Sequence, residues 1–207
     1  MTGSTSAQAM PFSSAIFFTG FPGTNAPPPT LGPYTMQAFG TDARTLGNSV
    51  TTVPTPIGSS ISFSPALDHY QVPHGGWATW SNLYTESVYG LYSGLPSVTI
   101  TLPSGTGAFY FYVESDAFAI IDFTAKAQNW TSSGSIPVNG NAGAKYFGFY
   151  TTGQTALTSI TVTSPSDAFA VGEFGIAAAP PTGCFYTPMP AVPHGHDSPA
   201  WGFVCRN

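Results

Sequence analysis

The sequence predicts an all-β protein, an antiparallel two-sheet sandwich of the jelly-roll kind with an extended N-terminal arm and an irregular C-terminal tail. Short stretches rich in β-branched and aromatic residues follow one another, separated by Gly, Pro, Ser and Asn. No stretch of about 12 residues shows a helical period. The phrase Ser-Asp-Ala-Phe-Ala occurs at 115–119 and again at 166–170, each time after a strand-like run. We interpret each copy as the turn of a β-hairpin that is built twice.

Residues 1–33 are expected to form a Pro-rich arm. Ile16, Phe17 and Phe18 make a short apolar run that suits one strand, and the prolines at 27–29 enforce an extended backbone. Such an arm either packs on its own domain or pairs with the open sheet edge of a second copy. The run from Ile16 to Phe18 is therefore the candidate assembly element.

Residues 34–177 are expected to form the sandwich itself. Val98, Ile100 and Leu102 alternate with polar residues, which indicates a strand with one face in the core. In 108–113, phenylalanines alternate with tyrosines, and we expect the tyrosine face to meet solvent. The candidate strands are 35–39, 50–53, 61–63, 84–92, 98–102, 108–113, 119–125, 146–150, 160–163 and 168–176.

Residues 178–207 are expected to form an irregular Pro- and Gly-rich tail. Cys184 and Cys205 are predicted to form a disulfide, which in chain-entropy estimates contributes about 3 kcal/mol. Free thiols or a metal site are the alternatives. A metal site would also draw on His194, His196 and Asp197, whose spacing matches no standard zinc module.

Composition limits the classes of partner. Charged residues make up 6% of the chain and the net charge is −5, so no basic stripe exists for nucleic acid or anionic lipid. A surface this poor in charge suits self-association, or a monomer kept soluble by hydroxyl groups. No run approaches the roughly 18–20 apolar residues of a membrane helix. The first ten residues do not form a signal peptide, and we expect a leader to have been removed.

The stretch from about 60 to 177 resembles an exported bacterial β-sandwich domain of unknown function, of the kind found in proteins with a PEP-CTERM sorting tail. The segments that carry the resemblance are 75–81, 98–103, 107–112, 146–150 and 169–176. The resemblance implies a sandwich fold and a location outside a bacterial cell or on its surface. The family's Pro-Glu-Pro signal, apolar span and basic end are replaced here by the cysteine-bearing tail.

Four acidic residues recur in equivalent places of the two Ser-Asp repeats. Asp116 and Asp167 lie in the predicted turns, whereas Asp122 and Glu173 lie in the strands that follow. Paired carboxylates act as acid and base or bind Ca²⁺ together with backbone carbonyls. The alternative for each turn aspartate is a hydrogen bond from a backbone amide two residues on. For Asp122 and Glu173, the alternative to Ca²⁺ is an internal hydrogen bond to Tyr or Trp. We expect no cofactor, with Ca²⁺ at these carboxylates as the alternative.

An aromatic, Gly-rich cluster is the candidate ligand site. It contains His74, Trp77, Trp80 and Tyr84. Exposed aromatic planes stack on sugar rings, which favours carbohydrate as the ligand. The alternative is that the two tryptophans cap the core at one end of a sheet.

The sequence contains no Gly-x-Ser-x-Gly, His-Glu-x-x-His, phosphate-loop or dinucleotide motif. We therefore expect a non-enzymatic structural or adhesive protein of the cell exterior, whose partners are copies of itself or extracellular polysaccharide. A carbohydrate-binding module, with or without Ca²⁺, is the second hypothesis. A hydrolase, which needs two acids that face one cleft, is the third.

Overall fold

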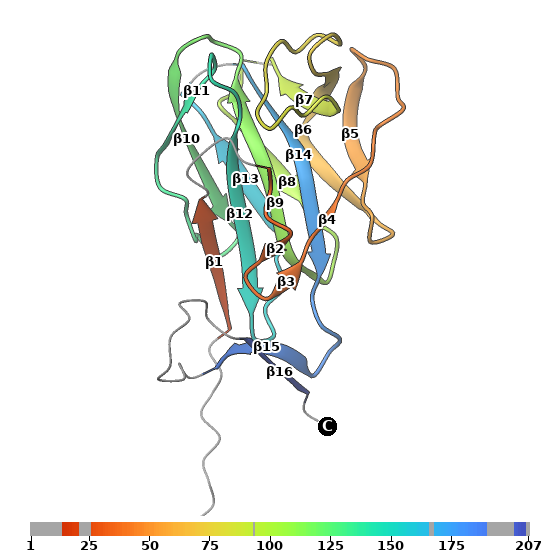
Figure 1. Cartoon of the computed structure of the whole chain (residues 1–207), viewed down its shortest axis with the longest axis vertical. Helices are drawn as coiled ribbons and strands as arrows, with labels where there is room; N and C mark the ends of the chain where they lie inside the picture. Colours follow the sequence, from red (N-terminus) through yellow and green to blue (C-terminus); the bar gives the residue numbers. More distant parts are fainter. Residues whose placement is uncertain (1–13, 21–25, 93, 166–167, 190–200, 206–207) are drawn as a thin grey trace, which may run out of the picture.

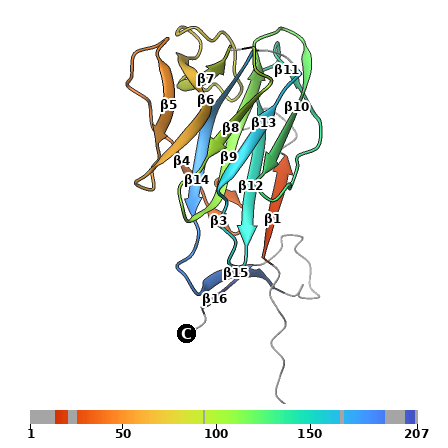
Figure 2. The same ribbon diagram turned by 180° about the vertical axis from the view of Figure 1, so that it is seen from behind.

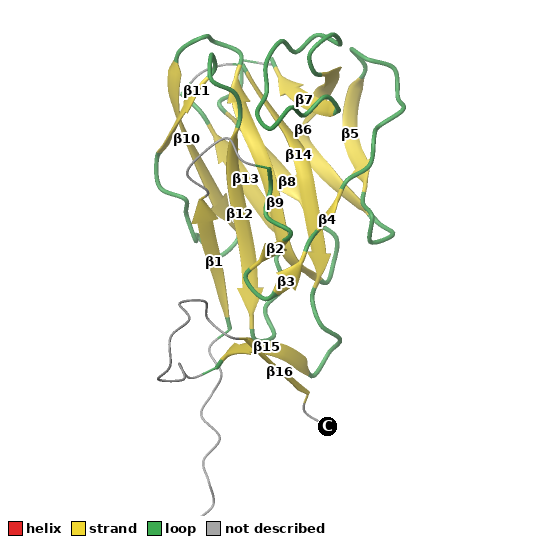
Figure 3. Ribbon diagram, viewed as in Figure 1, coloured by secondary structure: helices red, strands yellow, loops and turns green. Residues whose placement is uncertain are grey.

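A computed structural model describes residues 14–20, 26–92, 94–165, 168–189 and 201–205. These residues form strands and loops with no helix, so the predicted all-β class is confirmed (Figure 3). None of the described segments is a helix long and apolar enough to cross a membrane.

The strands form two antiparallel layers, which Figures 1 and 2 show from opposite sides. The first layer runs β1 (Ala15–Gly20), β12 (Lys145–Thr152), β9 (Thr106–Ser115) and β14 (Phe169–Ala178), with β7 (Ser87–Leu91) and β4 (Gln37–Ala38) both on the far edge of β14. The second runs β5 (Ser49–Pro54), β6 (Ser60–Gln71), β8 (Ser97–Thr101), β13 (Ser159–Thr163), β10 (Ile120–Ala127) and β11 (Ile136–Asn139). Pairing of β6 with β7 joins the layers, so that one sheet curls over on itself.

The main core lies between the two layers. Phe109 and Phe111 of β9 stack with centroids 5.9 Å apart, and Phe147 of β12 continues the stack. Ile100 and Val162 reach the same core from the second layer. Their strands alternate apolar and hydroxyl residues because only one face of that layer is buried.

A second core covers the outer face of the first layer and corrects the prediction that its tyrosines meet solvent. Tyr110 and Tyr112 are buried there, beneath Leu31 and Tyr34. The latter two belong to a small hairpin of β2 (Thr30–Leu31) and β3 (Tyr34–Thr35), drawn over β9 and β12 in Figure 1. The ring of Tyr34 leaves no room for a Cβ at Gly107. The expectation failed because alternation identifies two faces but not which of them a distant segment covers.

The two Ser-Asp repeats are not hairpin turns, which corrects the sequence interpretation. The first lies between β9 and β10, and the second, whose residues 166–167 are outside the described residues, lies between β13 and β14. In both cases the strands on either side belong to different layers. The repeats meet where β9 pairs with β14, with Ser115 opposite Phe169. Similar turn sequences therefore serve two crossovers that lie next to each other.

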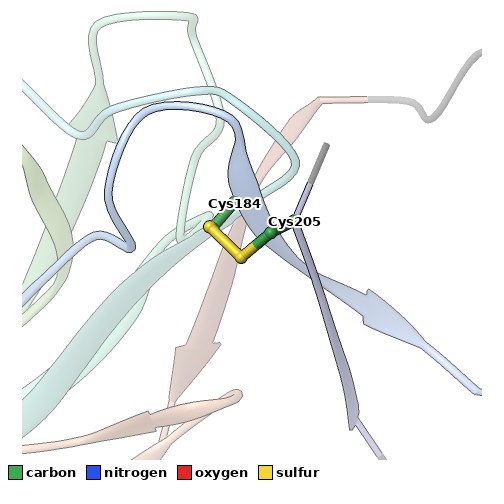
Figure 4. Close-up of a disulfide and its surroundings, with 2 residues drawn as sticks. All are labelled: Cys184 and Cys205. Atoms are coloured by element: carbon green, nitrogen blue, oxygen red, sulfur yellow. A yellow bond between two sulfur atoms is a disulfide. The ribbon is translucent and has the colours of Figure 1, made fainter. Parts of the chain in front are cut away.

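Strands near both ends of the chain extend the fold. The run from Ile16 to Phe18 lies in β1, which pairs with β12 of its own chain. At the other terminus, β15 (Cys184–Pro188) and β16 (Trp201–Cys205) form a two-stranded ladder, more regular than the expected tail. The predicted disulfide is confirmed: Cys184 and Cys205 are bonded and face each other in register (Figure 4).

Candidate functional site

Two side chains of the loop 72–86, between β6 and β7, donate hydrogen bonds to one buried carboxylate. Trp77 is only 4% exposed, and its indole Nε1 donates a hydrogen bond of 2.9 Å to Oε2 of Glu114. The hydroxyl of Thr79 donates to Oε1 of the same side chain at 2.7 Å. Glu114 belongs to β9 and is fully buried on the outer face of the first layer. Both oxygens of this carboxylate are thus bonded to the loop above them.

The same loop also donates hydrogen bonds to a second carboxylate, that of Glu173 on β14. Glu173 accepts a hydrogen bond of 3.0 Å from Nε1 of Trp80 and one of 3.3 Å from Nδ2 of Asn82. The pairing register of β14 shifts between Gly172 and Gly175, and Glu173 has a φ of 49° at this irregularity. The left-handed backbone re-aims the side chain toward the loop, which is the usual effect of a β-bulge.

Both carboxyls have strongly raised pKa values. Burial raises the pKa of Glu114 and of Glu173 to about 7, although hydrogen bonds from the loop act in the opposite direction. Raised carboxyl pKa values are common in catalytic sites, but a general acid must also reach a substrate. Here the carboxylate oxygens are bonded to indole, hydroxyl and amide groups of the loop. The arrangement suits a structural role, in which the two carboxylates hold the loop against the sheet.

The aromatic residues predicted to bind a ligand are divided between core and surface. Trp77 is buried, so its ring is not available to stack on a sugar. Trp80 and Tyr84 are half-buried and lie against each other, with ring centroids 6.2 Å apart. The hydroxyl of Tyr84 donates to the backbone carbonyl of Ser87. His74 is exposed at the start of the loop.

The acidic residues predicted to bind a metal do not gather in the described structure. Asp116 and Asp122 are exposed, and the carboxylate of Asp116 accepts a hydrogen bond from Tyr92. Glu173 is bonded to the loop, and Asp167 lies outside the described residues. Among those described, no three His, Cys, Asp or Glu side chains come together. The histidines at 194 and 196 and the aspartate at 197 also lie outside the described residues.

A serine–histidine pair is present but is enclosed. Nε2 of His69 lies 2.9 Å from Oγ of Ser87, and both residues are buried. A hydrolytic triad needs a carboxylate on the other imidazole nitrogen. The nearby carboxylate of Asp42 instead accepts hydrogen bonds from Tyr89 and Arg44, and the guanidinium holds its pKa well below the usual range. Among the described residues, no carboxylate bonds the other imidazole nitrogen, and burial leaves the pair without access for a substrate.

The outer side of the second layer is a nearly uncharged sheet face, which we call the hydroxyl face. Thr99 lies in register between Ser64 of β6 and Thr161 of β13, and the Thr99 and Thr161 hydroxyls are 3.0 Å apart. Lys126 of β10 ends this row, opposite Thr161. The face continues along the paired parts of β6, β8, β13 and β10. Its other residues there are Ser62, Ser97, Thr101, Thr124, Ser159 and Thr163.

A depression of about 220 Å³ lies at one edge of the hydroxyl face. Its lining includes Lys126, Gln128, Trp130, Ser159 and Thr161. Trp130 is 81% exposed. The sequence does not reveal this site, because a single tryptophan in a polar turn carries no pattern. A signal for the buried carboxylate of Glu114 does exist, since this glutamate continues a strand in which phenylalanine and tyrosine alternate.

Aromatic rings also gather where β1 and β12 meet β16. Phe17 stacks on Tyr150 with centroids 5.2 Å apart, and Trp201 meets Tyr150 edge-on at 6.1 Å. Phe203, two residues from Trp201 on the same face of β16, is 55% exposed. We call Phe17, Tyr150, Trp201 and Phe203 the aromatic base.

No protein-family model matches the chain, and its sequence has no significant match among curated proteins.

Proposed function

We propose that the chain is a non-enzymatic structural or adhesive subunit of the bacterial cell exterior, which assembles with copies of itself through the aromatic base. The observation that carries the proposal is the set of rings at this end of the molecule. Phe17 and Phe203 remain 41% and 55% exposed although each contacts another ring. Exposed apolar side chains that gather in one region mark interaction sites in soluble proteins.

The occupant we propose is a second copy of the same chain. Strands β1, β15 and β16 contain no charged residue, so two such ends meet without electrostatic repulsion. The net charge of −5 over 207 residues adds little repulsion at longer range. Burying an aromatic side chain is worth about 1.5–3 kcal/mol, so a few rings from each copy supply a useful part of an association energy.

The position of β1 favours surface docking over exchange of the N-terminal arm. Ile16 to Phe18 pair with β12 of their own chain, and the hydroxyl of Thr131 donates to the carbonyl of Ile16 at 3.2 Å. This strand is therefore already seated on its own sheet. Assembly through the aromatic base requires no strand to leave it.

Two further observations support a non-enzymatic role outside the cell. The buried carboxylates of Glu114 and Glu173 are bonded to the loop, and the His69–Ser87 pair is enclosed. The disulfide suits an oxidising compartment, where such bonds persist. We propose export from a bacterium on this ground together with the family resemblance.

Size-exclusion chromatography with light scattering tests the proposal. The wild-type protein should show species above the 21.6-kDa monomer, and Phe203→Ser should shift them toward the monomer. Phe118→Ser is the matched control, because Phe118 is 65% exposed in the 116–119 turn, outside the aromatic base. Equal masses for wild type and Phe203→Ser would contradict the proposal.

A further inference from the structure

We propose that the Trp130 depression and the adjoining hydroxyl face bind a neutral polysaccharide. This site lies on the second layer and uses none of the residues of the aromatic base. The inference is independent of the self-assembly proposed above. It rests on the exposure and backbone of Trp130, on the anchoring of its turn, and on the chemistry of the neighbouring strands.

Trp130 occupies a position that is unfavourable for a tryptophan in two respects. Its φ is 70°, in the left-handed region where a bulky residue is a genuine outlier. Its ring is also the most solvent-exposed large aromatic side chain among the described residues. Exposure means that the ring contributes little to the core, and the backbone conformation would suit glycine or asparagine better. Backbone strain of this kind is characteristic of binding sites.

The turn that carries Trp130 is firmly held. The N–H of Trp130 donates to the carbonyl of Ala127 at 2.9 Å, and the N–H of Ala127 donates to the carbonyl of Thr131 at 2.9 Å. The side chain of Gln128 donates to the carbonyl of Ala156 at 2.7 Å and accepts from the N–H of Thr158 at 3.3 Å. The indole is thus presented by a closed turn tied to the β12–β13 connection. A preorganised ring loses little entropy when a ligand binds.

The hydroxyl face supplies hydrogen-bonding groups next to this ring. Neighbouring strands place side chains about 4.8 Å apart, and alternate residues along one strand lie about 6.7 Å apart. Ser159 and Thr161 line the depression, and Thr99 continues the row away from it. A hydroxyl group both donates and accepts, so this array can match the hydroxyls of a sugar chain.

The charge on the face selects a neutral ligand. Two charged residues lie on this face of β10: Lys126, which lines the depression, and Asp122, which pairs with Pro137 of β11. These opposite charges give the surface no net preference for an anionic or cationic chain. An exposed indole beside hydroxyl groups matches a pyranose ring, which has an apolar face of C–H groups and a polar rim. The ligand class is therefore a neutral polysaccharide of pyranose units.

Affinity electrophoresis tests the inference with hydroxyethyl cellulose, laminarin and dextran as neutral probes and alginate as the anionic probe. We expect at least one neutral gel to retard the wild-type protein. Trp130→Ala should weaken that retardation about tenfold, the loss expected when an aromatic contact worth about 1.4 kcal/mol is removed. Thr161→Val, which removes one hydroxyl, should weaken it less, and Trp130→Tyr should retain part of it.

Phe118→Ala provides the control, because it truncates another exposed aromatic side chain without touching the depression. It should be retarded as the wild type is. Absence of retardation in all three neutral gels would overturn the inference, as would retardation in alginate alone. Retardation that survives Trp130→Ala would place any sugar binding elsewhere and would also overturn it.

Discussion

The indole of Trp77 and the carboxylate of Glu114 form a buried hydrogen bond of 2.9 Å between a loop and the sheet beneath it. Trp80 and Glu173 repeat the arrangement at 3.0 Å on the neighbouring strand. On burial each carboxylate loses hydrogen bonds from water, and the indole N–H replaces one of them. The carboxylate in turn is the acceptor that the indole N–H needs away from water. The loop 72–86 is thereby fixed over the outer face of the first layer.

Replacement of Trp77 by Phe should destabilise the protein by about 1–3 kcal/mol, because it leaves a buried carboxylate one donor short. The loss should be larger at pH 8 than at pH 5, since the ionised carboxylate needs the donor most. Trp80→Phe is the comparison: Trp80 is half-buried and Asn82 still donates to Glu173, so its cost should be smaller. Urea unfolding at both pH values measures the difference. Equal losses from the two variants would contradict this account.

The free energy of unfolding should fall as the pH rises from about 5 to about 8. In the folded protein the pKa values of Glu114 and Glu173 are raised from 4.5 to about 7. The folded state therefore binds these protons more tightly than the unfolded chain does. Their contribution is fully present below pH 4.5 and is lost as the pH rises through about 7.

The double variant Glu114→Gln with Glu173→Gln isolates this effect. Glutamine keeps the shape and an acceptor oxygen but does not titrate in this range. We expect its stability to change less with pH than that of the wild type, with the greatest gain over wild type at pH 8. Parallel stability–pH curves for the two proteins would show that these carboxyls are not the groups responsible.

Replacement of Trp130 by Gly should stabilise the protein by about 1 kcal/mol, because glycine adopts the left-handed backbone without strain. The ring is largely exposed, so little burial is lost. A rise in the thermal midpoint of this variant is the expected result. A fall would mean that the indole makes a structural contribution that its exposure does not reveal.

Removal of the disulfide by Cys184→Ser with Cys205→Ser should loosen the β15–β16 ladder. The bond joins residues 21 apart in sequence, for which chain entropy predicts a contribution of about 3 kcal/mol. We expect faster proteolysis in this region while the sandwich remains folded. Self-association should weaken as well, because Trp201 and Phe203 lie on β16. Unchanged proteolysis would show that ring contacts alone hold the ladder.

The sequence predicted the class of fold because alternation is a local signal. Val98 and Ile100 face the core as expected, and Cys184 and Cys205 pair as expected. The sequence does not distinguish the crossovers at the two Ser-Asp repeats from hairpins. A short polar turn that joins two strands of one sheet has the same composition as one that passes between two layers.

The candidate sites were harder to predict because they depend on contacts between distant segments. Glu114 and Trp77 are 37 residues apart, and nothing local marks them as partners. Trp130 stands out only when its exposure, its φ angle and the neighbouring Thr161 are known together. The aromatic base likewise combines residues from both ends of the chain.

Sedimentation velocity of the wild-type protein over a range of concentrations tests the central claim most directly. Assembly through an uncharged aromatic surface predicts species larger than the 21.6-kDa monomer, whose population grows with concentration and persists in about 1 M NaCl. A single 21.6-kDa species at every concentration and salt condition would contradict it.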